Sequence, residues 1–205
     1  MIRLTSRLGG RLAARWRHLA SRRSLLSAGC AGLAAEPGER VLSACRDHDG
    51  GYVLVATDRA LYRAEPGGWS RLGWDRVSKM AWDAEAGRFD ITVLSGTVLS
   101  GTRPTRMVVL ARECGVMPEL AAERMTHAYL GRWPVPLGDG QHVMVEARRQ
   151  PGTGRLLWAV VPGGCGPDVG GGDMRGRVEL AIASLAAEFG VIYRPRASGT
   201  AREAE

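Results

Sequence analysis

The stretch from Glu39 to Leu94 decides the architecture, and it reads ERVLSACRDHDGGYVLVATDRALYRAEPGGWSRLGWDRVSKMAWDAEAGRFDITVL. Short runs rich in Val, Leu, Ile, Tyr and Trp alternate there with turn-forming residues. Strands that recur about every 8–12 residues between such turns are typical of an antiparallel meander that closes into a barrel or sandwich. The turns fall at Asp49-Gly50-Gly51, Thr57-Asp58, Pro66-Gly67-Gly68 and Glu85-Ala86-Gly87.

Six strands are expected within this stretch. In the last of them Phe89, Ile91 and Val93 alternate with polar residues, which indicates a strand with one buried face. We expect Trp82 to be largely buried, because large aromatic side chains usually fill the core of a small barrel. The expected strands are Arg40–Arg46, Tyr52–Thr57, Ala60–Ala64, Trp69–Gly73, Val77–Trp82 and Arg88–Leu94.

The chain beyond Leu94 predicts one more strand, a helix and a second cluster of elements. A polar loop at Ser95–Arg103 precedes a seventh strand at Met107–Ala111, and a helix begins near Pro118 and runs to about Leu130, since proline suits the first helical turn. Pro134 and Pro136 forbid further helix, so Arg132–Leu137 is expected to be extended at best. The second cluster is a hairpin of His142–Arg149 and Leu156–Val161, the glycine-rich loop Gly163–Gly172 and a helix at Asp173–Phe189.

This second cluster is a ββα unit, which is too small to be stable alone. We therefore expect it to pack on the barrel as an appendage, with the alternative that its helix is the one that caps the barrel. The expected division is a basic segment at 1–35, a barrel plus helix at 36–131, the ββα appendage at 132–192 and a disordered tail at 193–205. The fold class is α+β and mainly antiparallel.

The order of these elements resembles that of pleckstrin-homology-like (PH-like) domains, which have six or seven short strands followed by one helix. The segments ATDRALY and GWDRVSKMAWD are similar to the T-D-x-A-L and W-D-x-V motifs of small uncharacterised PH-like proteins from high-GC Gram-positive bacteria. The resemblance covers roughly Pro37–Leu130. It implies a PH-like β-barrel with a capping helix, and a non-catalytic module that binds a protein partner or an anionic membrane surface.

The net charge of +7 is concentrated at the N-terminus. Residues 1–35 contain seven arginines and no acidic residue, which leaves 28 − 7 = 21 basic residues against 21 acidic ones in the rest of the chain. An amphipathic helix with Leu4, Leu8 and Leu12 on its apolar stripe would suit an anionic membrane surface. A transit peptide, a disordered tail and an over-extended gene start are the alternatives. The residues expected to contact a membrane or partner are Arg3, Arg7, Arg11, Arg15 and Trp16.

Other side chains offer weaker candidates for chemistry. Arg148 and Arg149 end a strand and suit an anion contact or a solvated strand end equally well. The four histidines and four cysteines lack the spacing of a zinc site, and the glycine-rich loop lacks the Gly-Lys-Ser/Thr end of a P-loop. We therefore expect no metal, no cofactor and no catalytic residue.

These observations favour a non-catalytic interaction module that binds a protein partner or an anionic membrane surface. Dispersed cysteines are typical of a reduced interior, so a cytoplasmic protein, peripheral to a membrane in one version, is expected. One alternative is an enzyme whose active site is assembled from distant residues. The other is a nucleic-acid adaptor acting through the arginine-rich segment, which the neutral body and the lack of a nucleic-acid-binding motif disfavour, so no specific nucleic acid is expected. The oligomeric state is open.

Overall fold

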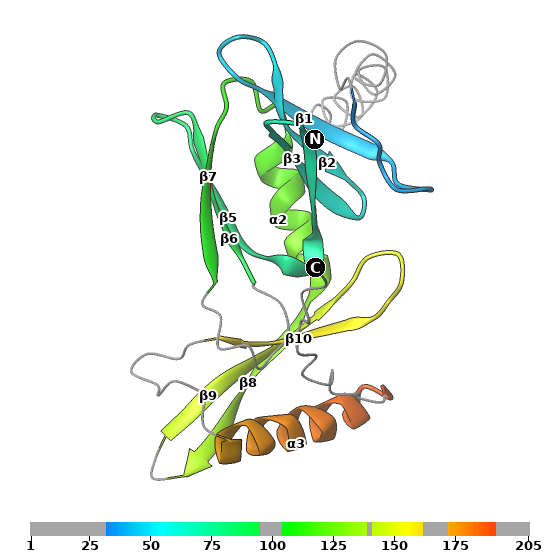
Figure 1. Cartoon of the computed structure of the whole chain (residues 1–205), viewed down its shortest axis with the longest axis vertical. Coiled ribbons are helices and arrows are strands. Elements are labelled where there is room, and N and C mark those ends of the chain that lie inside the picture. The colour runs from blue at the N-terminus through cyan, green and yellow to red at the C-terminus, as the bar shows by residue number, and fades with distance from the viewer. Residues whose placement is uncertain (1–31, 95–103, 139–140, 162–171, 192–205) are drawn as a thin grey trace, which may run out of the picture.

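The computed structural model describes residues 32–94, 104–138, 141–161 and 172–191 (Figure 1). These residues form three antiparallel sheets, two α-helices and one short 3₁₀-helix. The prediction of an α+β, mainly antiparallel architecture is confirmed. The expected strand and helix boundaries agree with the observed ones to within two residues in most cases.

The first sheet is a four-stranded meander in the order β1-β2-β3-β4. Its first turn lies at the expected Asp49-Gly50-Gly51, and Gly50 has a φ of 79°, a conformation that favours glycine. Asp47 Oδ1 accepts hydrogen bonds from the backbone N–H groups of Asp49 and Gly51 at 3.0 and 2.8 Å, which fixes the turn. The strands are β1 (Val41–Arg46), β2 (Tyr52–Thr57), β3 (Ala60–Glu65) and β4 (Gly68–Gly73).

The second sheet is a three-stranded meander in the order β5-β6-β7, and the 3₁₀-helix η1 (Trp74–Arg76) leads into it from β4. Phe89 and Ile91 of β6 are fully buried, which confirms the period-two pattern read from the sequence. The paired residues on the two neighbouring strands point to the same face of the sheet, since Phe89 pairs with Trp82 of β5 and Val109 of β7. The strands are β5 (Val77–Asp83), β6 (Arg88–Val93) and β7 (Thr105–Leu110).

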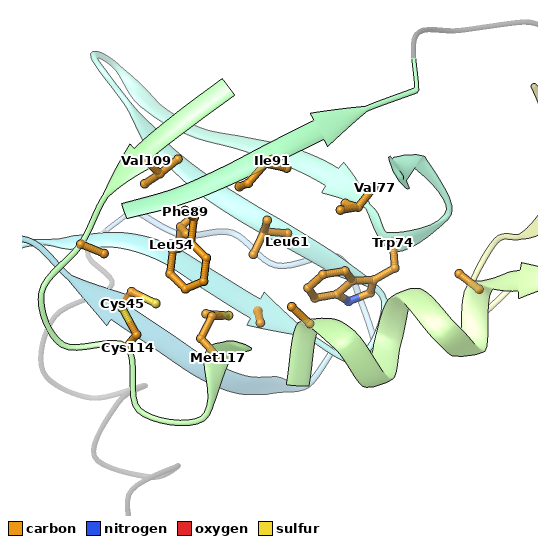
Figure 2. Packing of buried hydrophobic residues seen from close by; sticks show 14 residues of the cluster. Cys45, Leu54, Leu61, Trp74, Val77, Phe89, Ile91, Val109, Cys114 and Met117 are labelled. Carbon is orange, nitrogen blue, oxygen red and sulfur yellow. The ribbon is translucent and has the colours of Figure 1, made fainter. Parts of the chain in front are cut away.

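Helix α2 (Met117–Ala128) contributes to the same core as these two sheets (Figure 2). Leu54 and Leu61 come from the first sheet, Phe89 from the second and Met117 from the helix. Trp74 of η1 is completely buried, and its indole N–H donates to the Thr57 carbonyl at 2.9 Å. Trp74 is therefore the largest fully buried side chain that the structure describes.

Trp82, which we expected to be largely buried, is only partly buried. Its ring packs against Phe89 with the ring centroids 4.6 Å apart, at the margin of the core. The alternation of β5 does point Trp82 toward the core. Its register partner Phe89 on the central strand β6 is completely buried, whereas Trp82 lies on β5, an outer strand of the sheet.

The third sheet, in the order β10-β9-β8, packs against helix α3 (Gly172–Glu188). Its strands are β8 (Tyr129–Gly138), β9 (Gln141–Arg149) and β10 (Leu156–Val161). The expected ββα unit is thus βββα, because residues 132–137 belong to a ten-residue strand that directly follows α2. β8 is an edge strand, and an edge tolerates Pro134 and Pro136 where the proline nitrogen faces away from the partner strand.

The helix over the first two sheets is α2, so the alternative in which the last helix caps them is wrong. Helix α3 covers the third sheet through Val178, Ile182 and Ala186, all fully buried. Among the described residues the strands pair in three separate sheets, and no closed barrel forms. The PH-like barrel therefore stays a prediction.

Residues 33–40, named here the strap, run along the first sheet ahead of β1. Leu33 and Ala35 pack against Val55, Ala60 and Tyr62 on the sheet surface that faces away from α2. We expected the separate N-terminal segment to extend to residue 35, and these two contacts instead place its last residues in the folded body. The apolar side chains of the strap explain the difference, since they cover a sheet face that would otherwise be open to water.

Candidate interaction surface

Strand β7 presents apolar side chains to solvent on its outer face. Val108 is 49% exposed and Leu110 is 63% exposed, whereas Val109 between them is buried in the core. Alternation along a strand explains this pattern, because successive side chains point to opposite faces of a sheet. β7 is thus apolar on both faces over this segment, with only one face covered.

The backbone of β7 is also at the edge of its sheet. In the described ranges β6 is the strand that pairs with β7, from Val93↔Thr105 to Arg88↔Leu110. A strand at a sheet edge offers N–H and C=O groups to a further strand, and proteins usually blunt such edges with charges, prolines or bulges. Between residues 106 and 110 β7 has no proline and one charged residue, Arg106.

The charges beside this edge are already paired with one another. Arg106 Nη2 lies 2.7 Å from Asp90 Oδ1, and Arg88 lies 3.6 Å from Asp90 and 3.8 Å from Asp83. The hydrogen bond from Arg106 lowers the pKa of the Asp90 carboxyl below its ordinary value. An ion-paired patch on β6 therefore adjoins an apolar patch on β7, and the latter, Val108 and Leu110, is named here the β7 patch.

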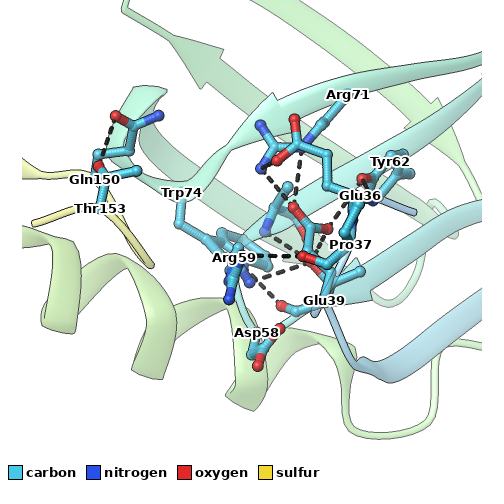
Figure 3. Close-up of polar contacts among 12 residues, drawn as sticks. Glu36, Pro37, Glu39, Asp58, Arg59, Tyr62, Arg71, Trp74, Gln150 and Thr153 are labelled. Carbon is cyan, nitrogen blue, oxygen red and sulfur yellow. Dashed lines mark hydrogen bonds and ion pairs between the residues drawn. The ribbon is translucent and has the colours of Figure 1, made fainter.

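The strap carries a cluster of polar contacts to the first sheet (Figure 3). The Glu39 side chain is 0% exposed, and its Oε1 accepts hydrogen bonds from Arg71 Nη2 at 2.5 Å and Nε at 3.1 Å. Its Oε2 accepts from Tyr62 Oη at 2.9 Å and Thr57 Oγ1 at 2.8 Å. Both carboxylate oxygens are thus used within the protein, so this cluster fastens the strap and leaves no acceptor for a ligand.

A second buried cluster joins the third sheet to the second. Glu146 is 1% exposed, and its carboxylate accepts from Arg132 Nη2 at 2.6 Å and from Arg148 Nε at 2.5 Å. Arg148 also donates to the backbone carbonyls of Val77 and Ser78 at 2.6 and 3.4 Å. Its guanidinium is therefore a bridge between two sheets.

These contacts show where the sequence candidates lie. Arg148 is buried, so the solvated strand end considered from the sequence is wrong for this residue, and its donors already have acceptors within the protein. Arg149 is exposed on the opposite face of β9. The residues expected to contact a membrane or partner, Arg3, Arg7, Arg11, Arg15 and Trp16, lie outside the described residues.

The described residues contain no group of three or more His, Cys, Asp or Glu side chains that could hold a metal ion. No helix in the described ranges is both long enough and apolar enough to span a bilayer. Comparison of the chain with protein-family models, curated proteins and solved structures finds no match.

Sequence reasoning missed the β7 patch, although a signal for it is present. The run Met107-Val108-Val109-Leu110 is continuously apolar, which is typical of a strand covered on both faces. The pattern predicts the strand but does not show whether its second face is covered. The exposure of Val108 and Leu110 shows that this face is uncovered, and the strand order places β7 at an edge.

Proposed function

We propose that this protein is a non-catalytic interaction module of PH-like type, and that it binds an extended segment of a protein partner along β7. The observation that carries the proposal is the combination, in one strand, of an apolar outer face and a sheet edge. Addition of a partner strand to such an edge supplies main-chain hydrogen bonds, while side chains at alternate positions provide specificity.

The PH-like part of the proposal is supported by the arrangement of the first two sheets and α2. Four strands and then three strands form successive meanders, and the helix that follows them contributes to their common core. The motif residues also have structural roles here: Asp58 accepts two hydrogen bonds from Arg40, and Trp74 fills the core.

The chemistry of β7 defines the partner segment. Residues facing Val108 and Leu110 should be β-branched or aromatic, because such pairs stabilise neighbouring strands. Proline is excluded wherever the segment must donate an N–H to β7. Because Arg106 is already paired with Asp90, an acidic residue in the partner adds little there.

A peptide-display selection on the full-length protein tests this proposal. We expect enrichment of proline-poor peptides with alternating apolar residues, and at least about tenfold weaker binding to Val108→Lys and Leu110→Lys variants, which place a charge in the apolar contact. Leu180→Lys is the matched control, since Leu180 is 74% exposed on α3. Equal binding to the wild type and to both β7 variants, or loss of binding in the control alone, would contradict the proposal.

An anionic membrane surface is the second candidate, and the observation in its favour is the charge of the N-terminal segment. The vesicle experiment compares the full-length protein with a protein that starts at Gly32, because this boundary keeps Leu33 and Ala35 on the first sheet. We expect the full-length protein to bind phosphatidylserine-containing vesicles at low salt and to release them as salt screens its arginines. Equal binding by the two proteins would move the membrane contact to the folded body.

A further inference from the structure

Two buried thiols lie side by side where the first sheet meets the connection from β7 to α2 (Figure 2). Cys45 belongs to β1 and is completely buried, and Cys114 lies just ahead of α2 and is 7% exposed. The Cys45 thiol donates a hydrogen bond to the Cys114 sulfur, and Figure 2 shows the two side chains next to each other. Neither cysteine takes part in a disulfide.

The backbone brings the two residues opposite each other. Arg46 and Glu113 form an antiparallel bridge, in which Arg46 N donates to Glu113 O at 3.0 Å and Glu113 N donates to Arg46 O at 3.4 Å. Extending this isolated bridge by one step in the antiparallel sense matches Cys45 with Cys114, at a position of the type that has no hydrogen bonds between the paired residues. Such positions bring Cα atoms to about 4.5 Å, within the range of about 4.4–6.8 Å that a disulfide spans.

We propose that Cys45 and Cys114 are a redox-modification site that closes to a disulfide on exposure to hydrogen peroxide. The bond would link β1 to the residues just ahead of α2, because the bridge between Arg46 and Glu113 already holds these two segments side by side. The small size of the oxidant is essential, since Cys114 is only slightly exposed and Cys45 not at all.

The reaction begins at Cys114, the more exposed thiol. Burial raises the pKa of both thiols, and the hydrogen bond from Cys45 offsets part of this rise at Cys114. The Cys114 thiolate attacks one peroxide oxygen, the O–O bond breaks and hydroxide leaves, which gives a sulfenic acid. The Cys45 thiolate then attacks Cys114 Sγ, the S–S bond forms and the S–O bond breaks with loss of a second hydroxide.

In total, two thiols and one hydrogen peroxide molecule react to give one disulfide and two water molecules. The sulfur pair gives up two electrons, the peroxide takes them, and the two thiol protons combine with the two hydroxide ions. Because the two cysteines are 69 positions apart, the bond closes a long loop and reduces the freedom of the unfolded chain. We therefore expect oxidation to raise Tm by about 10 °C.

Peptide mapping of the full-length protein tests the proposal. The reduced protein is treated with hydrogen peroxide while folded, then denatured, alkylated and digested. We expect a cross-linked peptide pair containing Cys45 and Cys114, a mass decrease of about 2 Da, and a rise in Tm that dithiothreitol reverses. A Cys30→Ser, Cys165→Ser variant should behave in the same way, whereas Cys114→Ser should show neither the cross-link nor the rise.

Two outcomes would overturn the proposal. One is the recovery of both thiols in alkylated form from protein that remains folded in peroxide. The other is the addition of oxygen to the two cysteines without a cross-link. If the serine variants do not fold, the mapping of the wild-type protein decides the matter alone, because it identifies which cysteines are joined.

Discussion

At the scale of single residues, two aspartates are placed in opposite electrostatic environments. Burial raises the pKa of Asp75, and the hydrogen bond from its own backbone N–H and the charges of nearby arginines offset only part of the rise. Burial also acts on Asp58, but the backbone and side-chain hydrogen bonds from Arg40 outweigh it and lower the pKa of that carboxyl.

These directions predict opposite pH dependences for two variants. The unfolded-state pKa of Asp is about 3.9. Because the folded-state pKa of Asp75 is higher, the wild-type protein loses stability as pH rises through the folded pKa. Asp75→Asn has no such loss, so its stability should increase relative to that of the wild type between about pH 4 and pH 7. Asp58 stabilises the fold above its unfolded pKa and loses that contribution as pH falls, so Asp58→Asn should lose stability at pH 7. Urea titrations at both pH values measure each difference. A gap between Asp75→Asn and the wild type that stays constant over this range would contradict the assignment.

Arg148 and Trp82 show what sequence patterns predict about single residues. Alternation along a strand correctly indicates that Trp82 points inward, but the burial of its ring also depends on the place of β5 as an outer strand of its sheet. The burial of Arg148 depends on the carbonyls of Val77 and Ser78, about seventy positions earlier in the chain. A contact over that separation leaves no local pattern in the sequence.

At the scale of elements, the strap depends on one buried carboxylate. Glu39→Gln keeps the shape of the side chain but removes the charge that Arg71 faces, and should destabilise the protein by about 2 kcal/mol. Arg40→Gln is the matched control, because Arg40 pairs with Asp58 at an exposed site and should cost less than about 1 kcal/mol. Urea unfolding measures both variants, and equal losses would contradict a specific role for the Glu39 carboxylate.

Most elements could be predicted from the sequence because their signals are local. The strands from Val41 to Val93 are predicted by glycine and aspartate at the turns and by alternating apolar residues between them. Pro118 predicts the start of α2. Strand β8 was missed because two prolines disfavour strand as well as helix, unless the strand lies at an edge. Edge or centre is a property of the sheet, which the segment itself does not encode.

At the scale of the whole molecule, the first two sheets with α2 are connected to the third sheet through Arg148. Replacing it by Met leaves Glu146 buried with only Arg132 as a partner, and removes the donors to β5, at a cost of about 3 kcal/mol. Arg149→Gln, on the exposed face of the same strand, should cost less than about 0.5 kcal/mol.

Hydrogen exchange measured by mass spectrometry distinguishes this role from a general loss of stability. In Arg148→Met we expect faster exchange in β8–β10 and α3, with little change in β1–β4, because the bridge holds the third sheet to the rest of the molecule. Uniformly faster exchange over all three sheets would show that Arg148 stabilises the molecule without a specific role between the sheets.

The division into three sheets follows from the sequence only in part. Seven strands followed by a helix could be read in order, and the structure distributes them between a four-stranded and a three-stranded sheet. The β7 patch emerges only at this scale, because it requires the order of the strands and the coverage of both faces. The N-terminal charge, in contrast, is a property of the sequence alone.

The central claim, that β7 is a binding edge, is tested most directly by amide chemical shifts. In ¹⁵N-labelled full-length protein titrated with a selected peptide, we expect the largest shift changes at residues 106–110 and in the paired strand β6, and slowed amide exchange along β7 as new hydrogen bonds form. Val108→Lys should abolish these changes at the same peptide concentration. Shift changes centred on α3 or the third sheet, with residues 106–110 unaffected, would contradict the account.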